Sequence, residues 1–143
     1  MRIAIISDIH ANFPALEETL KSIEQQNIDA VYCLGDLVGY NLWPNAVINE
    51  IRKRHIPTLE GNHDVKAVDI HKKGSKDSES YAYQIVGKEQ IEYLSKLPAH
   101  IKLEYQVINK LIMILMVHGS PYSNREYLLE DKNEKDFTNI FLD

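Results

Sequence analysis

The feature that most limits the possible folds of this chain is an alternation of short apolar runs with helical patterns in its first half. Residues 3–6 and 29–36 are apolar runs of the kind that form buried strands. Between them, after the potential cap residue Asn12, apolar side chains recur at helical spacing: Phe13, Leu16, Leu20 and Ile23. A second helix is predicted from Pro44, and a third strand over residues 56–64. This order predicts a parallel sheet with right-handed crossovers.

The second half of the chain has a more varied pattern. Residues 71–80 contain no apolar side chain, which predicts a solvated loop. Residues 81–96 have a helical pattern, residues 100–121 predict two strands joined as a hairpin, and residues 131–143 predict an amphipathic helix. Since 143 residues correspond to one domain, we expect an α/β fold with a single domain over residues 1–143.

Charge and composition narrow the classes of partner. With 16 Lys and Arg against 21 Asp and Glu, the net charge of -5 argues against a stable nucleic-acid complex. The single cysteine, Cys33, excludes an internal disulfide framework and favours a reducing compartment. The longest apolar run, residues 111–117, is far shorter than the roughly 20 residues of a membrane helix. The opening residues, "MRIAIISDIH", do not form a signal peptide, so we expect a cytoplasmic protein with no membrane association.

Polar side chains follow every predicted strand, at the point where the strand ends. They are Asp8 and His10, then Asp36, then Asn62 with His63 and Asp64, and finally His118. Because ligand sites form at the carboxyl ends of parallel strands, we expect these side chains to meet at one edge. Side chains i and i+2 of a strand point the same way, so Asp8 and His10 are predicted to face one point, provided that the strand geometry continues that far.

These residue types suit a metal site. Carboxylates and neutral imidazoles bind Mn²⁺, Fe or Zn²⁺, and an amide oxygen is a ligand of similar character. Asp36 has two carboxylate oxygens with which to bridge two ions, and paired metals about 3.5–4 Å apart can clamp a phosphate. Taken alone, Asp36 would be a turn residue after Gly35, and His118 a buried histidine; the ordered set favours ligands. Tyr40 and Trp43 either line a substrate pocket or pack in the core or at the rim.

Four motifs carry a resemblance to a known family: "SDIHAN" (7–12), "CLGDLVGY" (33–40), "EGNHD" (60–64) and "VHGSP" (117–121). With them the chain resembles the calcineurin-like metallophosphoesterases, in particular the small bacterial and archaeal phosphodiesterase type, over essentially its whole length. The resemblance implies a metallophosphoesterase-type α/β sandwich of two packed sheets flanked by helices.

The resemblance also implies a set of ligands and cofactors. Asp8 and His10 would bind the first metal, Asp36 would bridge both metals, and Asn62 and His118 would bind the second. The expected cofactors are two divalent metal ions, with Mn²⁺ as the first choice and Fe, Ni, Zn or Mg as alternatives.

The remaining implied roles are catalytic. The reaction would be hydrolysis of a small phosphodiester or phosphomonoester by in-line attack of a hydroxide that bridges the metals. His63 would stabilise developing charge and protonate the leaving oxygen, which suits an imidazole that titrates near neutral pH. Asp64 would hydrogen-bond to His63 or to a neighbour and fix its orientation.

One part of the family pattern is absent from this sequence. The family normally closes its site with Gly-His-x-His on a later strand, and the last histidine here is His118. Three explanations stay open: a C-terminally truncated product, a site completed by another chain, or a natural variant that works with fewer protein ligands. The alternative function is a catalytically impaired metal-binding or scaffold protein on the same fold. A missing strand would expose an unpaired sheet edge, so a homo-oligomer is a further prediction.

Overall fold

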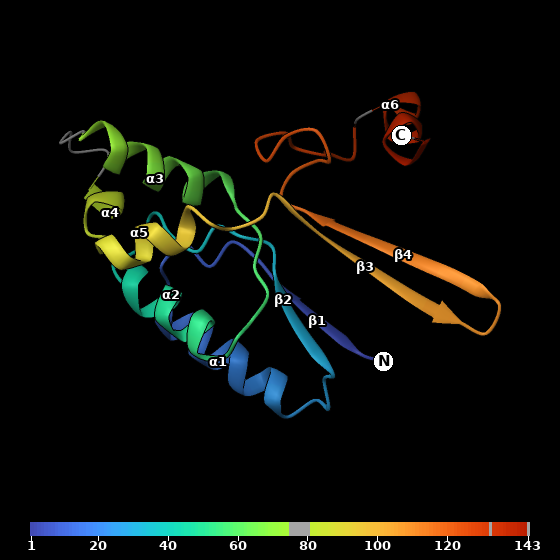
Figure 1. Ribbon diagram of the computed structural model, residues 1–143, viewed down its shortest axis with the longest axis horizontal. Helices are drawn as coiled ribbons and strands as arrows, with labels where there is room; N and C mark the ends of the chain where they lie inside the picture. The colour runs from blue at the N-terminus through green and yellow to red at the C-terminus, as the bar shows by residue number, and fades with distance from the viewer. Residues whose placement is uncertain (75–80, 132, 143) are drawn as a thin grey trace.

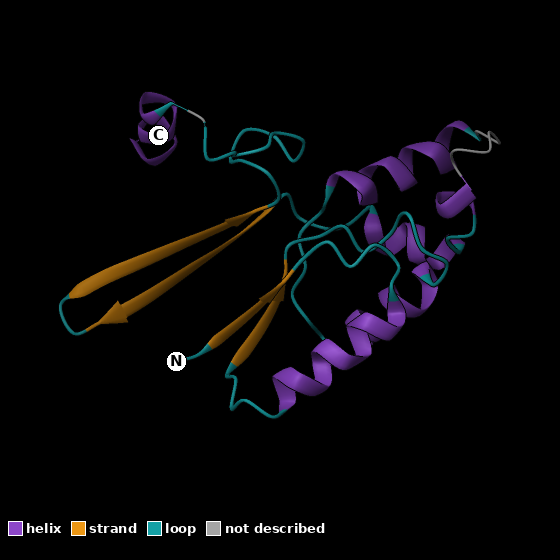
Figure 2. Cartoon of the chain, turned by 180° about the vertical axis from the view of Figure 1, so that it is seen from behind, coloured by secondary structure: helices purple, strands orange, loops and turns teal. Residues whose placement is uncertain are grey.

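The computed structural model describes residues 1–74, 81–131 and 133–142 and contains two small sheets and six helices within them. The strands are β1 (Ile3–Ile6), β2 (Ala30–Cys33), β3 (His100–Val107) and β4 (Lys110–Val117), and the helices are α1 (Phe13–Glu24), α2 (Pro44–Lys53), α3 (Asn62–Lys73), α4 (Tyr81–Gln84), α5 (Lys88–Leu94) and α6 (Glu134–Leu142). Helices α1 to α5 lie on one side of β1 and β2, and the β3–β4 hairpin lies on the other (Figures 1 and 2). The predicted mixed α/β fold with two sheets is confirmed.

The first sheet pairs β1 with β2 in parallel, from Ile3 opposite Ala30 to Ile6 opposite Cys33. Helix α1 makes the crossover between them, as predicted. The third predicted strand is reduced to a single bridge beside β2, where Cys33 N–H donates to Pro57 O and Leu59 N–H donates to Cys33 O. Pro57 has no N–H to extend this ladder, and the chain turns into α3 a few residues later.

The local signals for the helices are confirmed for α1 and α2. The Asn12 side chain accepts a hydrogen bond from Ala15 N–H at the start of α1, and α2 begins at Pro44. The pattern over residues 81–96 forms two short helices, because Gly87 ends the first segment and is the N-cap of α5.

Helix α3 corrects two predictions. Residues 62–64 were expected at the end of the third strand, where it runs into a loop, but they form the first turn of α3, with Gly61 as its N-cap. The loop predicted over residues 71–80 is also partly wrong, because 71–73 continue α3 and Gly74 ends it with φ 66°. Basic side chains in a last helical turn interact favourably with the helix dipole, so a run without apolar residues can still be helical. Residues 75–80 lie outside the described residues.

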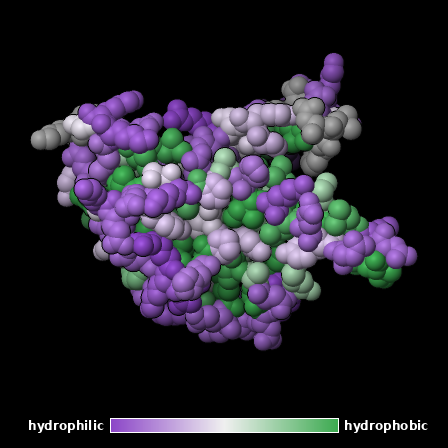
Figure 3. All heavy atoms as spheres, viewed as in Figure 1, coloured by the Kyte–Doolittle hydropathy of each residue, from purple (hydrophilic) through white to green (hydrophobic). Residues whose placement is uncertain are grey.

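The hydrophobic core lies between the first sheet and helices α1, α2, α3 and α5. Its members include Leu16, Leu20, Cys33, Val47, Ile48, Ile51, Val68 and Leu94. The second sheet is an antiparallel hairpin whose β4 strand is apolar on both faces, and Leu111, Met113 and Leu115 are each more than half exposed. The space-filling view shows hydrophobic side chains interspersed with hydrophilic ones on the protruding hairpin (Figure 3). Among the described residues, the helices are all too short or too polar to cross a membrane.

Candidate metal centre

The loops after β1 and β2 run side by side beyond the ends of the two strands. Leu34 N–H donates to Ile6 O at 2.9 Å, Asp8 N–H to Gly35 O at 3.1 Å and His10 N–H to Asp36 O at 2.9 Å. These backbone bonds continue the pairing of the sheet and place Asp8 and His10 next to Asp36. The side chains therefore meet at the carboxyl edge of the strands, as the alternation of elements predicted.

The convergence of Asp8 and His10 has a different cause from the one predicted. Strand geometry ends at Ile6, and Asp8, His10 and Asp36 adopt φ values of 54°, 47° and 55°. This left-handed conformation is unfavourable for residues other than glycine, and it persists only where surrounding contacts hold it. The two side chains face one point because the backbone turns, since the strand geometry on which the prediction depended does not continue past Ile6.

Two glycines allow the second loop and the start of α3 to approach each other closely. A Cβ atom on Gly61 would lie 2.1 Å from Asp36 Oδ1, and one on Gly35, at φ 89°, would lie 2.3 Å from Gly61 N. Real Cβ atoms do not approach other heavy atoms so closely. Glycine at these positions is therefore what lets the Asp36 carboxylate lie against the first turn of α3.

Asp36 lies at the centre of the cluster and is 2% exposed. Its Oδ1 atom accepts a hydrogen bond from His63 N–H at 2.8 Å, whereas Oδ2 lies 3.8 Å from His10 Nε2 and 3.5 Å from His118 Nε2. Within the described part of the chain, Asp36 has no lysine or arginine ion pair. A buried carboxylate of this kind requires a compensating positive charge.

The first candidate ligand group is on the side of His10. Its Nδ1 atom lies 3.1 Å from Val38 O, an interaction that requires the hydrogen on Nδ1 and leaves a lone pair on Nε2. The Nε2 atom faces Asp8 Oδ1 at 3.6 Å as well as Asp36, and the Asp8 side chain is 57% exposed. Potential ligand atoms of His10, Asp36 and His63 also lie within 4.8 Å of one another.

The second group brings the end of β4 to the same carboxylate. His118 Nδ1 lies 2.7 Å from Leu34 O, and its Nε2 lies 2.9 Å from Asn62 Oδ1. Because Nδ1 donates to the carbonyl, Nε2 of the neutral ring presents a lone pair to the oxygen atoms of Asn62 and Asp36. Three electron-pair donors that face one another fit a bound cation, so these residues suit the divalent metal that the resemblance implies. Potential ligand atoms of Asp8, Asp36 and His118 lie within 4.8 Å of one another.

Asp64 supports the loop of Asp36 and does not contact His63 through its side chain. Its Oδ2 atom accepts from Asp36 N–H at 2.8 Å and Gly61 N–H at 3.0 Å, and its Oδ1 atom accepts from Leu37 N–H at 2.9 Å. Burial raises the pKa of the Asp64 carboxyl to about 7, and the backbone N–H groups oppose this rise because they bind the charged form. Asp64 was predicted to hydrogen-bond to His63 or to a neighbour. The hydrogen bonds of its carboxyl group are with neighbouring backbone N–H groups and not with His63.

His63 has two tyrosines as its side-chain partners. The hydroxyl of Tyr83 lies 2.6 Å from Nδ1, and that of Tyr40 lies 3.3 Å from Nε2. Burial lowers the pKa of His63, and the negative charge of Asp36 opposes this effect. Sequence reasoning missed Tyr83, because nothing in a helical pattern over residues 81–96 marks one tyrosine as a histidine partner.

Tyr40 and Trp43, for which the sequence left pocket, core and rim positions open, both lie at the surface. The Tyr40 ring is 4.7 Å from that of His10 and 4.8 Å from that of His63, yet Tyr40 is 71% exposed. Trp43 is 47% exposed. The position of Tyr40 fits the rim of the site, where a ligand can reach it.

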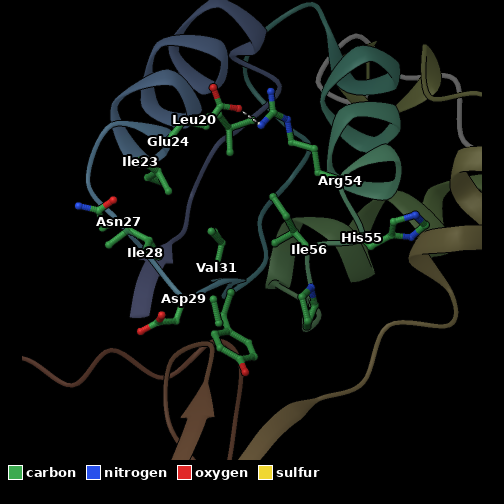
Figure 4. A pocket seen from close by; sticks show the side chains of 13 residues that line it. Leu20, Ile23, Glu24, Asn27, Ile28, Asp29, Val31, Arg54, His55 and Ile56 are labelled. Carbon is green, nitrogen blue, oxygen red and sulfur yellow. Dashed lines mark hydrogen bonds and ion pairs between the residues drawn. The ribbon is translucent and has the colours of Figure 1, made fainter. Parts of the chain in front are cut away.

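Two cavities differ in their relation to this cluster. One of about 540 Å³ opens beside Asp8, Asn62 and His118 and is also lined by residues 124–128. Another, of about 490 Å³, lies at the opposite end of the strands, where Leu20, Ile23 and Val31 form an apolar wall (Figure 4). Only the first of these two adjoins the candidate ligands.

Fold and site together define an α/β protein with a candidate metal centre at the carboxyl edge of its parallel strands. The family model of calcineurin-like phosphoesterases matches residues 1–142, and the chain belongs to this family. The predicted resemblance is therefore confirmed. Membership in a metallophosphoesterase family implies divalent metal ions, and the two ligand groups described above are their candidate positions.

Similar proteins extend this result. Uncharacterized protein MJ0912 of Methanocaldococcus jannaschii is 31% identical over 136 residues, which are 90% of this chain and 54% of that protein. The crystal structure of a metallophosphoesterase from Sphaerobacter thermophilus has a TM-score of 0.65 and 30% identity, covering 90% of this chain and 51% of that one. The structure of a candidate diadenosine tetraphosphatase has a TM-score of 0.61 and 29% identity, covering 71% of this chain and 45% of that one. The chain thus spans about half the length of these relatives.

Proposed function

We propose that this chain is a metal-dependent phosphoesterase that hydrolyses small phosphodiesters or phosphomonoesters. The observation that carries the proposal is the position of Asp36 Oδ2, which is buried between His10 Nε2 at 3.8 Å and His118 Nε2 at 3.5 Å. One carboxylate oxygen between two imidazole lone pairs is suited to bridging two cations. Membership in the calcineurin-like phosphoesterase family also supports a phosphoesterase function.

The proposed cofactors are two divalent ions, held by Asp8, His10 and Asp36 on one side and by Asp36, Asn62 and His118 on the other. When bound, they supply Lewis-acid stabilisation of the charge on the phosphate ester. Mn²⁺ is the proposed metal, and Fe, Ni, Zn and Mg are compatible with the same ligand types.

The protein's own residues have three further tasks in this proposal. His63 gives a proton to the leaving oxygen, a role for which a neutral-range imidazole is suited. Asp64 is a positioning residue, because its carboxyl oxygens hold the backbone N–H groups of Asp36 and Gly61. Tyr40 is placed at the rim, where its exposed ring can contact the substrate.

The test is hydrolysis of bis(p-nitrophenyl) phosphate with and without added Mn²⁺. We expect metal-dependent turnover that falls by about 100-fold or more in His63→Ala, the range of general-acid catalysis. His100→Ala is the matched control, because His100 is an exposed histidine at the start of β3 and belongs to neither ligand group. Turnover that needs no metal, or that survives His63→Ala, would contradict the proposal.

The alternative of a metal-binding or scaffold protein is distinguished by a separate measurement. Elemental analysis of the purified chain tests metal content independently of activity. Two equivalents of metal together with turnover support the enzyme, whereas bound metal without turnover favours the alternative.

The proposed substrate is a small phosphate ester, because a net charge of -5 opposes stable binding to a nucleic-acid backbone. Because one similar structure is that of a candidate diadenosine tetraphosphatase, dinucleoside polyphosphates are one class to include in a substrate screen. A cytoplasmic location also stays a proposal, and it rests on Cys33, which is a free and buried thiol.

A further inference from the structure

Three large exposed side chains lie on the loop of residues 40–43, which leads from the Asp36 turn to α2. Tyr40 is 71% exposed, Leu42 is 63% exposed and Trp43 is 47% exposed. Single exposed apolar residues are common on protein surfaces, but a group of them at one place marks a surface that takes part in binding. The loop therefore needs a ligand or partner that explains this exposure.

Hydrogen bonds fasten this loop to the turn that carries His10. The backbone N–H of Asn41 donates to His10 O at 3.3 Å, and the side-chain Nδ2 of Asn41 donates to the same oxygen at 2.8 Å. Trp43 N–H donates to Ala11 O at 3.2 Å. The loop is thus held in place relative to a candidate metal ligand, and a compound bound at the metal centre has this surface beside it.

The backbone of Tyr40 has an unfavourable conformation. Its φ is 60°, in the left-handed region that few residues other than glycine adopt, and it follows Gly39 with φ 97°. Asn41 N–H donates to Gly39 O at 2.7 Å, which closes a tight turn around Tyr40. Strain of this kind persists where surrounding contacts hold it, and it is frequent at ligand sites.

This turn places the Tyr40 ring against two histidines of the site. The ring centroid lies 4.7 Å from that of His10 and 4.8 Å from that of His63, and the hydroxyl lies 3.3 Å from His63 Nε2. Most of the Tyr40 surface still faces solvent, because the residue is 71% exposed. An exposed aromatic face beside a phosphate site is a surface on which a planar ring can stack.

We propose that Tyr40 selects phosphate esters whose leaving alcohol carries a planar aromatic ring, and that this ring stacks on the open face of the tyrosine. The inference rests on the proposed phosphoesterase function, which places the leaving oxygen beside His63. Because Tyr40 lies against the His63 ring, the group on that oxygen has Tyr40 as its neighbour. An aryl group on the ester oxygen and a nucleobase one sugar away share this stacking chemistry.

The first test measures the binding of phosphonates, whose bond between phosphorus and carbon is not hydrolysed, to the protein with Mn²⁺ by calorimetry. Benzylphosphonate resembles phenyl phosphate in shape and charge, ethylphosphonate lacks the ring, and cyclohexylmethylphosphonate has an apolar ring that is not planar. We expect benzylphosphonate to bind at least about 5-fold more tightly than either of the others, as stacking on one aromatic side chain predicts. Equal affinities, or no binding of benzylphosphonate, would overturn the proposal.

Variants of Tyr40 separate the ring from the backbone and from the hydroxyl. Tyr40→Asn removes the ring but keeps a residue that tolerates the left-handed conformation, so benzylphosphonate affinity should fall about 5-fold while ethylphosphonate affinity stays unchanged. Tyr40→Phe keeps the ring and should keep the preference. Tyr81→Ala is the matched control, because Tyr81 is 59% exposed and belongs to neither ligand group. Equal weakening of both phosphonates in Tyr40→Asn, or loss of the preference in Tyr40→Phe, would refute stacking.

The source of the ring and the link to catalysis have separate measurements. The phosphonate analogue of AMP should lose more affinity in Tyr40→Asn than benzylphosphonate does if the ring is a nucleobase, and less if it is an aryl group; either order supports stacking. For bis(p-nitrophenyl) phosphate, Tyr40→Asn should raise KM about 5-fold with kcat nearly unchanged, and a fall in kcat at constant KM would contradict the proposal. A protein without turnover would refute the proposed function, whereas the phosphonate affinities would still decide the role of Tyr40.

Discussion

Asp36 joins several interactions in one small side chain. It receives the backbone N–H of His63 on one oxygen and faces two imidazoles with the other, while its own N–H is held by Asp64. Its burial would be costly without positive charge, and the neighbouring lone pairs make a cation the fitting source of that charge.

Asp36→Asn tests this role. The amide has the same shape but only one oxygen and no charge, so we expect metal content to fall below one equivalent and turnover by about 100-fold or more. Elemental analysis and rate measurements check both effects. Asp69→Asn, in α3 but outside both ligand groups, is the control and should retain its metal. Full metal occupancy in Asp36→Asn would contradict a bridging role.

Cys33 allows a second prediction at this scale. Burial raises the pKa of its thiol to about 12, and the residue is 0% exposed. The native thiol should therefore react with iodoacetamide at least about 100-fold more slowly than the unfolded chain, whose thiols ionise near 8.5. The same shift means that this group's contribution to stability is lost as the pH rises from about 8.5 toward 12. Mass spectrometry of labelled samples measures the rate, and equal labelling of native and unfolded protein would refute the prediction.

At the scale of elements, the helix α3 determines how the third motif reaches the site. Because the helix begins directly after Gly61, the backbone N–H of His63 points at Asp36 while the Asn62 side chain reaches His118. The positive end of the helix dipole is then close to the acidic cluster, which favours negative charge there. A loop at this position would supply the same side chains without this fixed orientation.

Gly61→Ala tests the close approach of α3 to the Asp36 loop. Gly61 has an ordinary φ of -90°, so the expected effect comes from the clash with Asp36 and not from backbone strain. We expect a loss of about 1–3 kcal/mol in the free energy of unfolding, together with weaker metal binding.

Gly74→Ala is the matched control for this measurement. Gly74 has φ 66°, but a Cβ there meets no atom within 4 Å, so its substitution should cost about 1 kcal/mol and leave metal affinity unchanged. Urea unfolding and metal titration of both variants check the comparison. The idea of a steric limit fails if Gly61→Ala binds metal as tightly as Gly74→Ala does.

For the whole molecule, the least covered part is the β3–β4 hairpin. The β4 strand carries Leu111, Met113 and Leu115 on one face with exposures of 57%, 61% and 51%. In the described chain, β4 pairs only with β3, so its other edge has no strand beside it. Exposed apolar faces and free edges favour association, and the homo-oligomer stays a prediction. The assignment of residues 1–143 to one domain also stays a prediction.

Met113→Lys tests whether the hairpin drives self-association. A charge in the middle of the apolar face should shift the protein toward monomer by about 10-fold in dissociation constant, as measured by sedimentation. Gln106→Lys is the matched control, since it adds the same charge to the same face of the hairpin without removing an apolar side chain. Identical association of the original protein and Met113→Lys would exclude this face as the contact.

Much of the fold could be read from local patterns. The strand at 3–6, the core of the strand predicted at 29–36 (30–33 in the structure), the helix capped by Asn12 and the hairpin near residue 109 each depend on periodicity or turn chemistry within a short window. The exceptions were the third strand and the loop over 71–80. Pro57 lacks the N–H that a longer third strand needs, and the basic residues 71–73 extend α3 into the segment predicted as a loop.

The order of polar residues after successive strands was enough to predict which side chains gather at the candidate site, because parallel strands place their carboxyl ends at one edge. Tertiary structure decided how they gather. Contacts between segments far apart in the chain hold the left-handed turns at Asp8, His10 and Asp36. Such contacts also explain why the Asp64 carboxyl binds backbone N–H groups and not the His63 ring. The pairing of His63 with Tyr83 is of the same kind, since a hydrogen bond between two helices leaves no periodic trace in the sequence.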